Sequence, residues 1–117
     1  MDEASAVRLP NGKSARVDRA KVVEYLLNKS HPDGSGKAGF FSRFGFALAR
    51  WGELAAALRL HGQTQPVVFV VESAHGTRYT VQGPLKTPDG RKPCVRTVWI
   101  MDLGSDAPRL ITAYPAG

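Results

Sequence analysis

The hydrophobic pattern of this chain changes near residue 65, and that change constrains its fold more than any other feature. Before residue 65, apolar side chains recur at the three- and four-residue spacing of a helix face. After it, apolar and polar residues alternate in short runs separated by turn-forming segments, as they do in β-strands. This order predicts an α+β fold, in which about three N-terminal helices pack on one face of an antiparallel sheet.

The first predicted helix covers residues 19–29. Asp18 is its expected N-cap, and Lys29 lies near the end where a cation suits the helix dipole. The apolar stripe of this helix consists of Ala20, Val23, Leu26 and Leu27. The preceding residues 1–17 are expected to form a short extended or hairpin segment around the turn signal Pro-Asn-Gly at residues 10–12.

Two more helices complete the helical part of the chain. One covers residues 37–46, where phenylalanines recur at the spacing of helical neighbours. The other covers about 51–60, and Gly62 is its expected C-terminal stop. The helical part of this single domain is therefore expected to span residues 18–62.

Four strands are predicted between residues 65 and 115. Turn-forming residues separate them, and their ranges are 66–72, 77–86, 93–102 and 108–114. Connections this short join neighbouring strands in antiparallel order, so the sheet is expected to be a four-stranded meander.

Alternation along the last two predicted strands assigns their side chains to faces of the sheet. In the third strand, one face carries Val95, Thr97, Trp99 and Met101, and the other carries Arg96, Val98, Ile100 and Asp102. In the fourth strand, one face carries Leu110, Thr112 and Tyr114, and the other carries Arg109, Ile111 and Ala113. Neither face of the third strand is wholly apolar, so both faces of the sheet are expected to be partly buried.

The chain is basic, with 16 Lys and Arg against 10 Asp and Glu and a net charge of +6. This charge attracts polyanions and acidic proteins, and it does not choose between them. No apolar run approaches the length that crosses a membrane, and no secretory signal is visible at the N-terminus. We therefore expect no membrane association.

The histidines and the cysteine give no sign of a metal site. The sequence contains no HExxH motif, no paired His or Cys ligands and no clustered carboxylates, so neither a metal nor another cofactor is expected. His61 and His75 are expected in surface or loop positions. Cys94 is the single cysteine, which excludes an internal disulfide, and it is expected to be buried or half-buried in a strand.

The stretch HPDGSGK, residues 31–37, is a candidate phosphate site. It is not a P-loop, because His31 occupies the first glycine position and Ala38 replaces the serine or threonine after Lys37. Its glycines and the start of the next helix can still bind an anion, and His31 can transfer a proton near neutral pH. A histidine and a lysine facing one phosphate are what metal-free RNA cleavage requires. The alternative is a solvated turn between two helices.

Arginines in and beside the predicted sheet form a second candidate region. They are Arg78, Arg91, Arg96 and Arg109. Guanidinium groups pair well with phosphate oxygens, and the hydroxyls of Thr112 and Tyr114 would extend such a site. The alternative is that all of these are ordinary residues of strands and sheet edges.

Several segments resemble a family of small bacterial proteins. The most specific are GKAGFF at residues 36–41, the PDGR turn and RTVWI strand within residues 88–100, and the terminal TAYP. This family is known as domain of unknown function 6883, and the resemblance covers nearly the whole chain from about residue 21. The family name carries no assigned activity.

More loosely, the order of helices and sheet and a last strand reading LITAYP resemble the barnase–EndoU–colicin–RelE superfold. Members of that superfold are mostly metal-independent ribonucleases, and many are toxins. The resemblance implies catalytic roles for His31, Lys37, Arg96, Thr112 and Tyr114, and substrate binding by Lys29, Arg78, Arg91 and Arg109. A lysine, arginine or tyrosine would serve as the acid–base partner of the histidine.

The leading hypothesis is a metal-independent endoribonuclease that acts as the toxin of a toxin–antitoxin or effector–immunity pair. An acidic antitoxin or immunity protein would cover its basic cleft, and the enzyme would act in the cytoplasm of its own cell or of a target cell. Two alternatives stay open. One is a non-enzymatic basic module that binds an acidic protein or nucleic acid, and the other is an accessory subunit whose sheet completes another protein's core.

Overall fold

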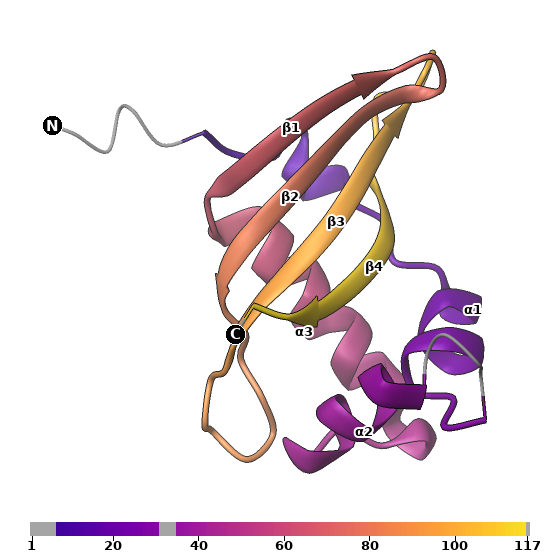
Figure 1. Cartoon of the computed structure of the whole chain (residues 1–117), viewed down its shortest axis with the longest axis vertical. Helices are drawn as coiled ribbons and strands as arrows, with labels where there is room; N and C mark the ends of the chain where they lie inside the picture. The colour runs from indigo at the N-terminus through magenta and orange to yellow at the C-terminus, as the bar shows by residue number, and fades with distance from the viewer. Residues whose placement is uncertain (1–6, 31–34, 117) are drawn as a thin grey trace, which may run out of the picture.

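The computed structural model describes residues 7–30 and 35–116 and contains an antiparallel sheet with helices behind it (Figure 1). The helical elements are η2 (Gly12–Ser14), α1 (Arg19–Lys21), η3 (Val22–Leu26), α2 (Ser35–Arg43), η4 (Leu48–Arg50) and α3 (Trp51–Thr64). The strands are β1 (Val67–Ser73), β2 (Gly76–Pro84), β3 (Cys94–Asp102) and β4 (Arg109–Pro115), paired in the order β1-β2-β3-β4. The predicted α+β meander is confirmed.

The hydrophobic core lies between α3 and the face of the sheet that α3 covers (Figure 1). α3 contributes Leu54 and Leu58, and the sheet contributes Trp99, all of them fully buried. α2 and η3 close one end of this core with Phe41 and Leu26. Each fully buried side chain of this kind stabilises the fold by about 1.5–3 kcal/mol, so this contact between layers dominates the stability.

The described residues before α1 do not form the hairpin that was one of the two predicted arrangements. The amide of Val67 donates to the carbonyl of Val7 over 2.8 Å, beside β1. Further along, the amide of Arg16 donates to the carbonyl of Pro108 over 2.8 Å, and the amide of Leu110 donates to the carbonyl of Arg16 over 2.9 Å. The two extended arms therefore bond to opposite edges of the sheet, and for that reason they do not pair with each other.

The first two helices differ from the prediction at their ends. α1 begins after Asp18, which holds the N-cap position without a side-chain capping bond, and η3 continues the helix only to Leu26. α2 begins at Ser35, before the predicted start, and ends at Arg43. Gly45 then adopts a left-handed φ of 100° in the turn that follows, as expected of a glycine that ends a helix.

A π turn changes which residues of the first helix reach the core. The amide of Leu27 donates over 2.8 Å to the carbonyl of Val22, five residues earlier, instead of four. The wider turn buries Val22 completely. The predicted stripe is correspondingly wrong at two positions, because Val23 is only half-buried and Ala20 is exposed.

Gly62 is not the stop of α3, because the helix continues to Thr64. A Cβ atom at Gly62 would lie 2.5 Å from Cζ2 of Trp99. Such a distance is far inside van der Waals contact, so the indole of Trp99 packs directly against the backbone of α3. Glycine is needed here for this close approach and not for a turn.

Replacing Gly62 with alanine is expected to lower the free energy of unfolding by about 1–3 kcal/mol, because the new methyl group overpacks the core. Chemical denaturation measures this loss. Gly52→Ala, in the first turn of the same helix, is the control, because a Cβ there meets nothing within 4 Å. It should be neutral or stabilising by up to about 1 kcal/mol. Equal losses in the two variants would contradict the close packing.

His61 was expected at the surface, but it is buried in α3 with 2% exposure. Its Nε2 lies 3.0 Å from the carbonyl oxygens of Gly83 and Val95, which only accept, so Nε2 carries the proton. Its Nδ1 accepts from the Thr97 hydroxyl over 2.8 Å, and that oxygen accepts from Trp99 Nε1 over 2.9 Å. Burial lowers the pKa of the histidine more than its carbonyl hydrogen bonds raise it. The neutral ring thus ties α3 to β2 and β3.

A β-bulge in β4 corrects the predicted faces of the last strand. Trp99 pairs with Leu110. The preceding residue, Val98, pairs with Thr112, so Ile111 is an extra residue that reverses the alternation. The helix side therefore receives Leu110 and Ala113, and the outer face receives Arg109, Thr112 and Tyr114.

The predicted faces of β3 agree with the structure. Its helix side is fully buried at Val95, Thr97 and Trp99. On the outer face, Val98 and Ile100 are 8% and 7% exposed, so both faces of the sheet are partly buried, as expected. His75 is exposed in the turn after β1, as expected, but Cys94 at the start of β3 is exposed and not buried. Alternation with Val95, which is fully buried on the helix side, places Cys94 on the outer face, and this explains the difference.

Candidate functional site

Polar and basic side chains from three elements meet beside β4. Tyr25 of η3 lies at the centre, with its Oη 3.4 Å from Oγ1 of Thr112 in β4. The ammonium nitrogen of Lys21 lies 5.1 Å from the centroid of the Tyr25 ring, and that of Lys37 lies 5.3 Å from it. These four residues, Lys21, Tyr25, Lys37 and Thr112, are called the Tyr25 cluster below.

Local structure explains how the cluster assembles. Lys21 and Tyr25 are four residues apart across the junction of α1 and η3, which places them on one side of the helix. Lys37 lies in the first turn of α2, a helix that contacts both η3 and β4. The bulge at Ile111 turns Thr112 to the outer face of the sheet. A π turn and a bulge therefore both contribute to the position of this site.

The environment of Tyr25 favours its ionised form. Burial raises the pKa of the phenol, and this is the largest single effect. The hydrogen bonds of Thr112 and Lys37 and the charges of Lys37 and Lys21 act in the opposite direction. Together they prevail, and the pKa of Tyr25 lies below its ordinary value of 10.0. A tyrosine of this kind exchanges a proton more readily than one in water.

The Tyr25 cluster places two cations beside a phenol whose pKa is lowered. The two ammonium groups attract an anion, and Lys37 stands at the N-terminal end of α2, where the helix dipole adds partial positive charge. Both cations lie close to the phenol ring of Tyr25. A phosphate bound by the lysines would lie next to a hydroxyl that can accept or donate a proton.

The structure brings together only some of the residues predicted to form the site. His31 lies outside the described residues. Lys37 and Thr112 meet through Tyr25. Arg96 and Tyr114 are paired across β3 and β4 on the same outer face as Thr112. The guanidinium of Arg96 nevertheless extends toward β2 and β1 and not toward the cluster.

Three of the residues predicted to bind substrate lie elsewhere. The Arg109 guanidinium is bound by both carboxylate oxygens of Asp102, at 2.7 and 3.1 Å. This pairing raises the pKa of Arg109 and lowers that of Asp102, so the arginine's charge is already largely compensated. Arg78 is exposed on the outer face of β2, and Lys29 is exposed after η3. None of them contacts the Tyr25 cluster in the described part of the chain.

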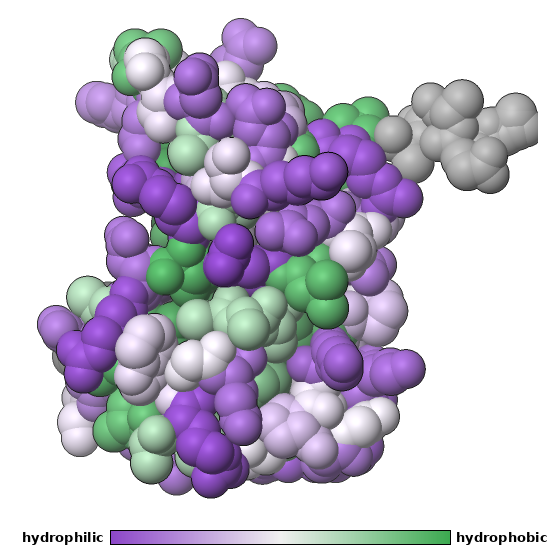
Figure 2. All heavy atoms as spheres, turned by 180° about the vertical axis from the view of Figure 1, so that it is seen from behind, coloured by the Kyte–Doolittle hydropathy of each residue, from purple (hydrophilic) through white to green (hydrophobic). Residues whose placement is uncertain are grey.

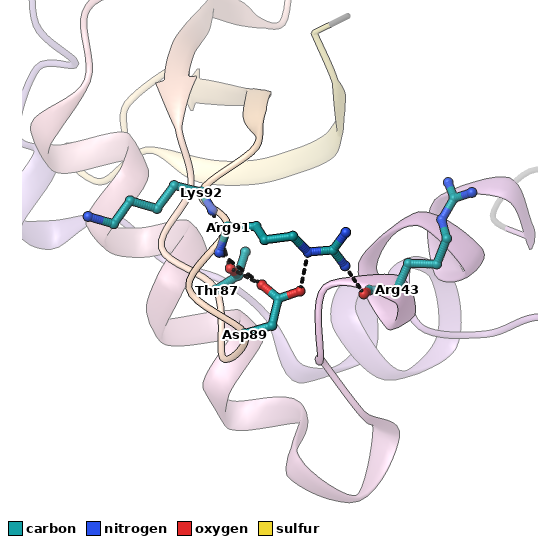
Figure 3. Close-up of polar contacts among 5 residues, drawn as sticks. All are labelled: Arg43, Thr87, Asp89, Arg91 and Lys92. Atoms are coloured by element: carbon teal, nitrogen blue, oxygen red, sulfur yellow. Dashed lines mark hydrogen bonds and ion pairs between the residues drawn. The ribbon is translucent and has the colours of Figure 1, made fainter.

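Arg91 connects the loop between β2 and β3 to α2 (Figure 3). Its Nε lies 2.6 Å from Oδ2 of Asp89, and its Nη2 donates to the carbonyl of Arg43 at the end of α2. The guanidinium also lies over the ring of Phe44, 4.3 Å from the centroid. The oxygen Oδ1 of Asp89 accepts from the hydroxyl of Thr87 over 2.8 Å. These contacts give Arg91 a structural role and orient the loop.

Two surface grooves do not contain the cluster. The larger, of about 750 Å³, is lined by Val23, Glu24, Leu27, Asn28, Lys29, Ser42, Phe46, Ala47 and Leu48. It holds one carboxylate and one cation, which is a poor match for a phosphate. The other, of about 350 Å³, lies beside the outward side of α3, where Leu60 is 44% exposed.

Seen from behind, apolar atoms gather across the middle of the molecule (Figure 2).

No three His, Cys, Asp or Glu side chains of residues 7–30 and 35–116 lie close enough together to hold a metal ion. Over the same residues, each helix is too short or too polar to span a bilayer.

The sequence pattern missed Tyr25 and Lys21. Their four-residue spacing on a basic helix was a usable signal, because an aromatic ring and an ammonium at that spacing lie side by side. No sequence pattern indicated that Thr112, the partner of Tyr25 on β4, would lie beside it. Thr112 was named from its strand, but only the structure places it against Tyr25.

The same fold is found in a solved structure. One chain of the contact-dependent growth inhibition toxin–immunity protein complex from Klebsiella pneumoniae 342 has the same architecture, with a TM-score of 0.68. The match covers 97% of this chain and 96% of that chain at 17% sequence identity, which establishes a shared fold. The chain itself belongs to the family described as Domain of unknown function (DUF6883), whose model matches residues 8–117. No curated protein matches the sequence.

Proposed function

We propose that this protein is a metal-independent endoribonuclease and the toxin of a toxin–immunity pair. The observation that carries the proposal is the Tyr25 cluster, in which two ammonium groups, one of them in the first turn of α2, lie beside a phenol with a lowered pKa. Metal-free RNA cleavage needs this combination of phosphate binding and proton transfer.

In the proposed reaction, the 2′-hydroxyl of a ribose attacks the adjacent phosphorus. A base takes the proton of that hydroxyl, the P–O5′ bond breaks, and an acid protonates the departing 5′-oxygen. The products are a 2′,3′-cyclic phosphate and a 5′-hydroxyl end. Lys37 and Lys21 stabilise the extra negative charge of the pentacoordinate transition state. Tyr25 is one member of the acid–base pair, and His31 is the proposed other member.

The net charge of the chain favours the toxin of such a pair over its immunity protein. A toxin–immunity complex contains two kinds of chain, and a ribonuclease toxin must attract RNA while its inhibitor must cover the same surface. The net charge of +6 suits the chain that binds RNA and an acidic partner. Its site of action would be the cytoplasm, either of its own cell or of a target cell that receives the toxin.

The test is incubation of the purified protein with total bacterial RNA in the presence of EDTA. We expect discrete products that end in 2′,3′-cyclic phosphates. Lys37→Ala should reduce the cleavage rate by about 100-fold or more, the loss typical of a group that stabilises transition-state charge. Lys13→Ala is the matched control, because Lys13 is an exposed lysine of η2, an element that contributes no residue to the cluster. It should cleave at the wild-type rate.

Two results would count against the proposal. Intact RNA after prolonged incubation with folded protein would exclude general ribonuclease activity. Equal cleavage by the Lys37→Ala variant and the wild type would move the active site away from the cluster.

A second candidate function is binding without turnover. The outer face of the sheet favours it, because Arg78 is exposed there and the guanidinium of Arg96 stacks over Phe69, 5.3 Å from its centroid. Exposed aromatic rings beside arginines bind single-stranded nucleic acid without catalysis. Salt-sensitive retention of intact RNA would identify this function.

A further inference from the structure

The outer edge of β1 is an open strand edge. β1 is the first strand of the sheet order, so only one of its sides pairs with β2. Among the described residues, the bond between the amide of Val67 and the carbonyl of Val7 is the only backbone hydrogen bond at its other side, and it lies at the start of the strand. Along the rest of this edge, no other described residue pairs with the outward amide and carbonyl groups of β1.

This edge is also apolar on both faces. Four consecutive residues are about half exposed: Val68 at 42%, Phe69 at 53%, Val70 at 50% and Val71 at 56%. Soluble proteins usually protect edges with lysine, proline or short strands. β1 has seven residues, and Glu72 near its end is its only charge. An unprotected edge of this length is suited to pairing with a strand from another chain.

Positive charge borders the open edge on the outer face of the sheet. Arg96 originates two strands away, but its Nε donates to Oε1 of Gln82 over 2.7 Å, and its guanidinium lies 5.3 Å from the centre of the Phe69 ring. The cation therefore lies beside a side chain of β1. Arg78, which is paired with Val71, adds a second exposed cation on this face.

We propose that the β1 edge binds an extended segment of an acidic partner protein, which adds a fifth strand to the sheet. Backbone hydrogen bonds to β1 would supply affinity, and carboxylates on the outer face of the added strand would pair with Arg96 and Arg78. A second copy of this chain fits less well, because it would bring two charges of +6 together.

This binding surface is separate from the proposed ribonuclease site. β1 and β4 are opposite edges of the sheet, and the Tyr25 cluster lies beside β4. A strand bound at β1 would leave the cluster uncovered. The proposal therefore does not depend on ribonuclease activity, and the partner would anchor or localise the protein without blocking its site.

The test uses a synthetic nine-residue peptide of alternating valine and glutamate, titrated into the isotopically labelled protein. We expect saturable shifts of backbone amide signals that are concentrated in β1 and weaken at high salt. Arg96→Glu should reduce the affinity by roughly tenfold, because it turns the attraction into repulsion. Lys13→Glu changes the net charge equally at a distant site, so it controls for non-specific attraction. A peptide methylated on alternate backbone nitrogens should not bind.

Several results would overturn the proposal. Absence of shifts at millimolar peptide would do so, as would shifts concentrated at the Tyr25 cluster, or equal losses in the Arg96→Glu and Lys13→Glu variants. Sedimentation that shows a dimer of the protein alone, abolished by Val71→Lys, would assign the edge to a second copy instead. None of these measurements depends on RNA cleavage, so they are independent of the proposed function.

Discussion

Replacing His61 with alanine is expected to lower the free energy of unfolding by about 3–5 kcal/mol, the range for large buried side chains. The change opens a cavity between α3 and the sheet. It also removes the hydrogen bonds that the ring makes to the carbonyls of Gly83 and Val95 and to the hydroxyl of Thr97. Each buried polar group left without a partner costs about 1–3 kcal/mol. Chemical denaturation measures the loss.

The control is His75→Ala, because His75 lies exposed in the turn between β1 and β2. It should leave stability within about 0.5 kcal/mol of the wild type.

The hydrogen bonds of His61 also predict a pH dependence of stability. The pKa of His61 is lower in the folded protein than in the unfolded chain, where it is about 6.5. As pH falls below that value, the unfolded chain binds the proton before the folded protein does, and this favours unfolding. The wild type should lose stability as pH falls from that value through the folded pKa. If the free energy of unfolding changed with pH in the same way in the wild type and in the His61→Ala variant, the buried neutral ring would be contradicted.

Replacing Tyr25 with phenylalanine is expected to slow RNA cleavage by about 100-fold or more, the contribution typical of a general acid or base. The substitution removes one hydroxyl and keeps the ring that the two lysines approach, so the fold should persist. Single-turnover cleavage of a defined RNA measures the rate. Tyr79→Phe, on β2, is the matched control and should cleave normally. Equal rates for the two variants would remove Tyr25 from the acid–base pair.

The same tyrosine can be tested without RNA. The chain contains three tyrosines, and ultraviolet absorbance follows their ionisation as pH rises. One component, absent from the Tyr25→Phe variant, should titrate earlier than an ordinary tyrosine, because Lys37, Lys21 and Thr112 favour its anion. Lys37→Met should move this component to higher pH. A titration that is unchanged in the Lys37→Met variant would show that the lysine does not act on the phenol.

The four strands could be predicted closely from sequence, and the helix ends less well. Alternation and turn residues mark strands on both sides, so β3 was predicted at 93–102 and found at Cys94–Asp102. The end of α3 was predicted too early, because Gly62 has the local appearance of a stop. Its true role depends on Trp99, which is distant in sequence and packs against it. The same error left His61 outside the helix and therefore outside the core.

The candidate site could be predicted only in part, for a related reason. Lys37 and Thr112 were named from residue chemistry alone. The residue that joins them, Tyr25, sits in a π turn, and Thr112 follows a bulge. Both features break the regular periods on which sequence patterns depend, so the faces deduced from those periods were wrong at these positions. Arg109 and Arg91 were named for their charge. In the structure, Arg109 forms an ion pair with Asp102, and Arg91 forms one with Asp89.

The hydrogen bond between Tyr25 and Thr112 joins residues that are 87 positions apart. A ribosome that has made the helices and the first three strands has therefore not yet made the site. The segment before α1 also cannot pair fully until β4 has been made, because the amide of Leu110, at the start of β4, donates to the carbonyl of Arg16. Long-range pairing of this kind also forms slowly. If the protein is a toxin, its site is completed only after the ribosome has made β4, so synthesis of the earlier elements alone yields no active protein.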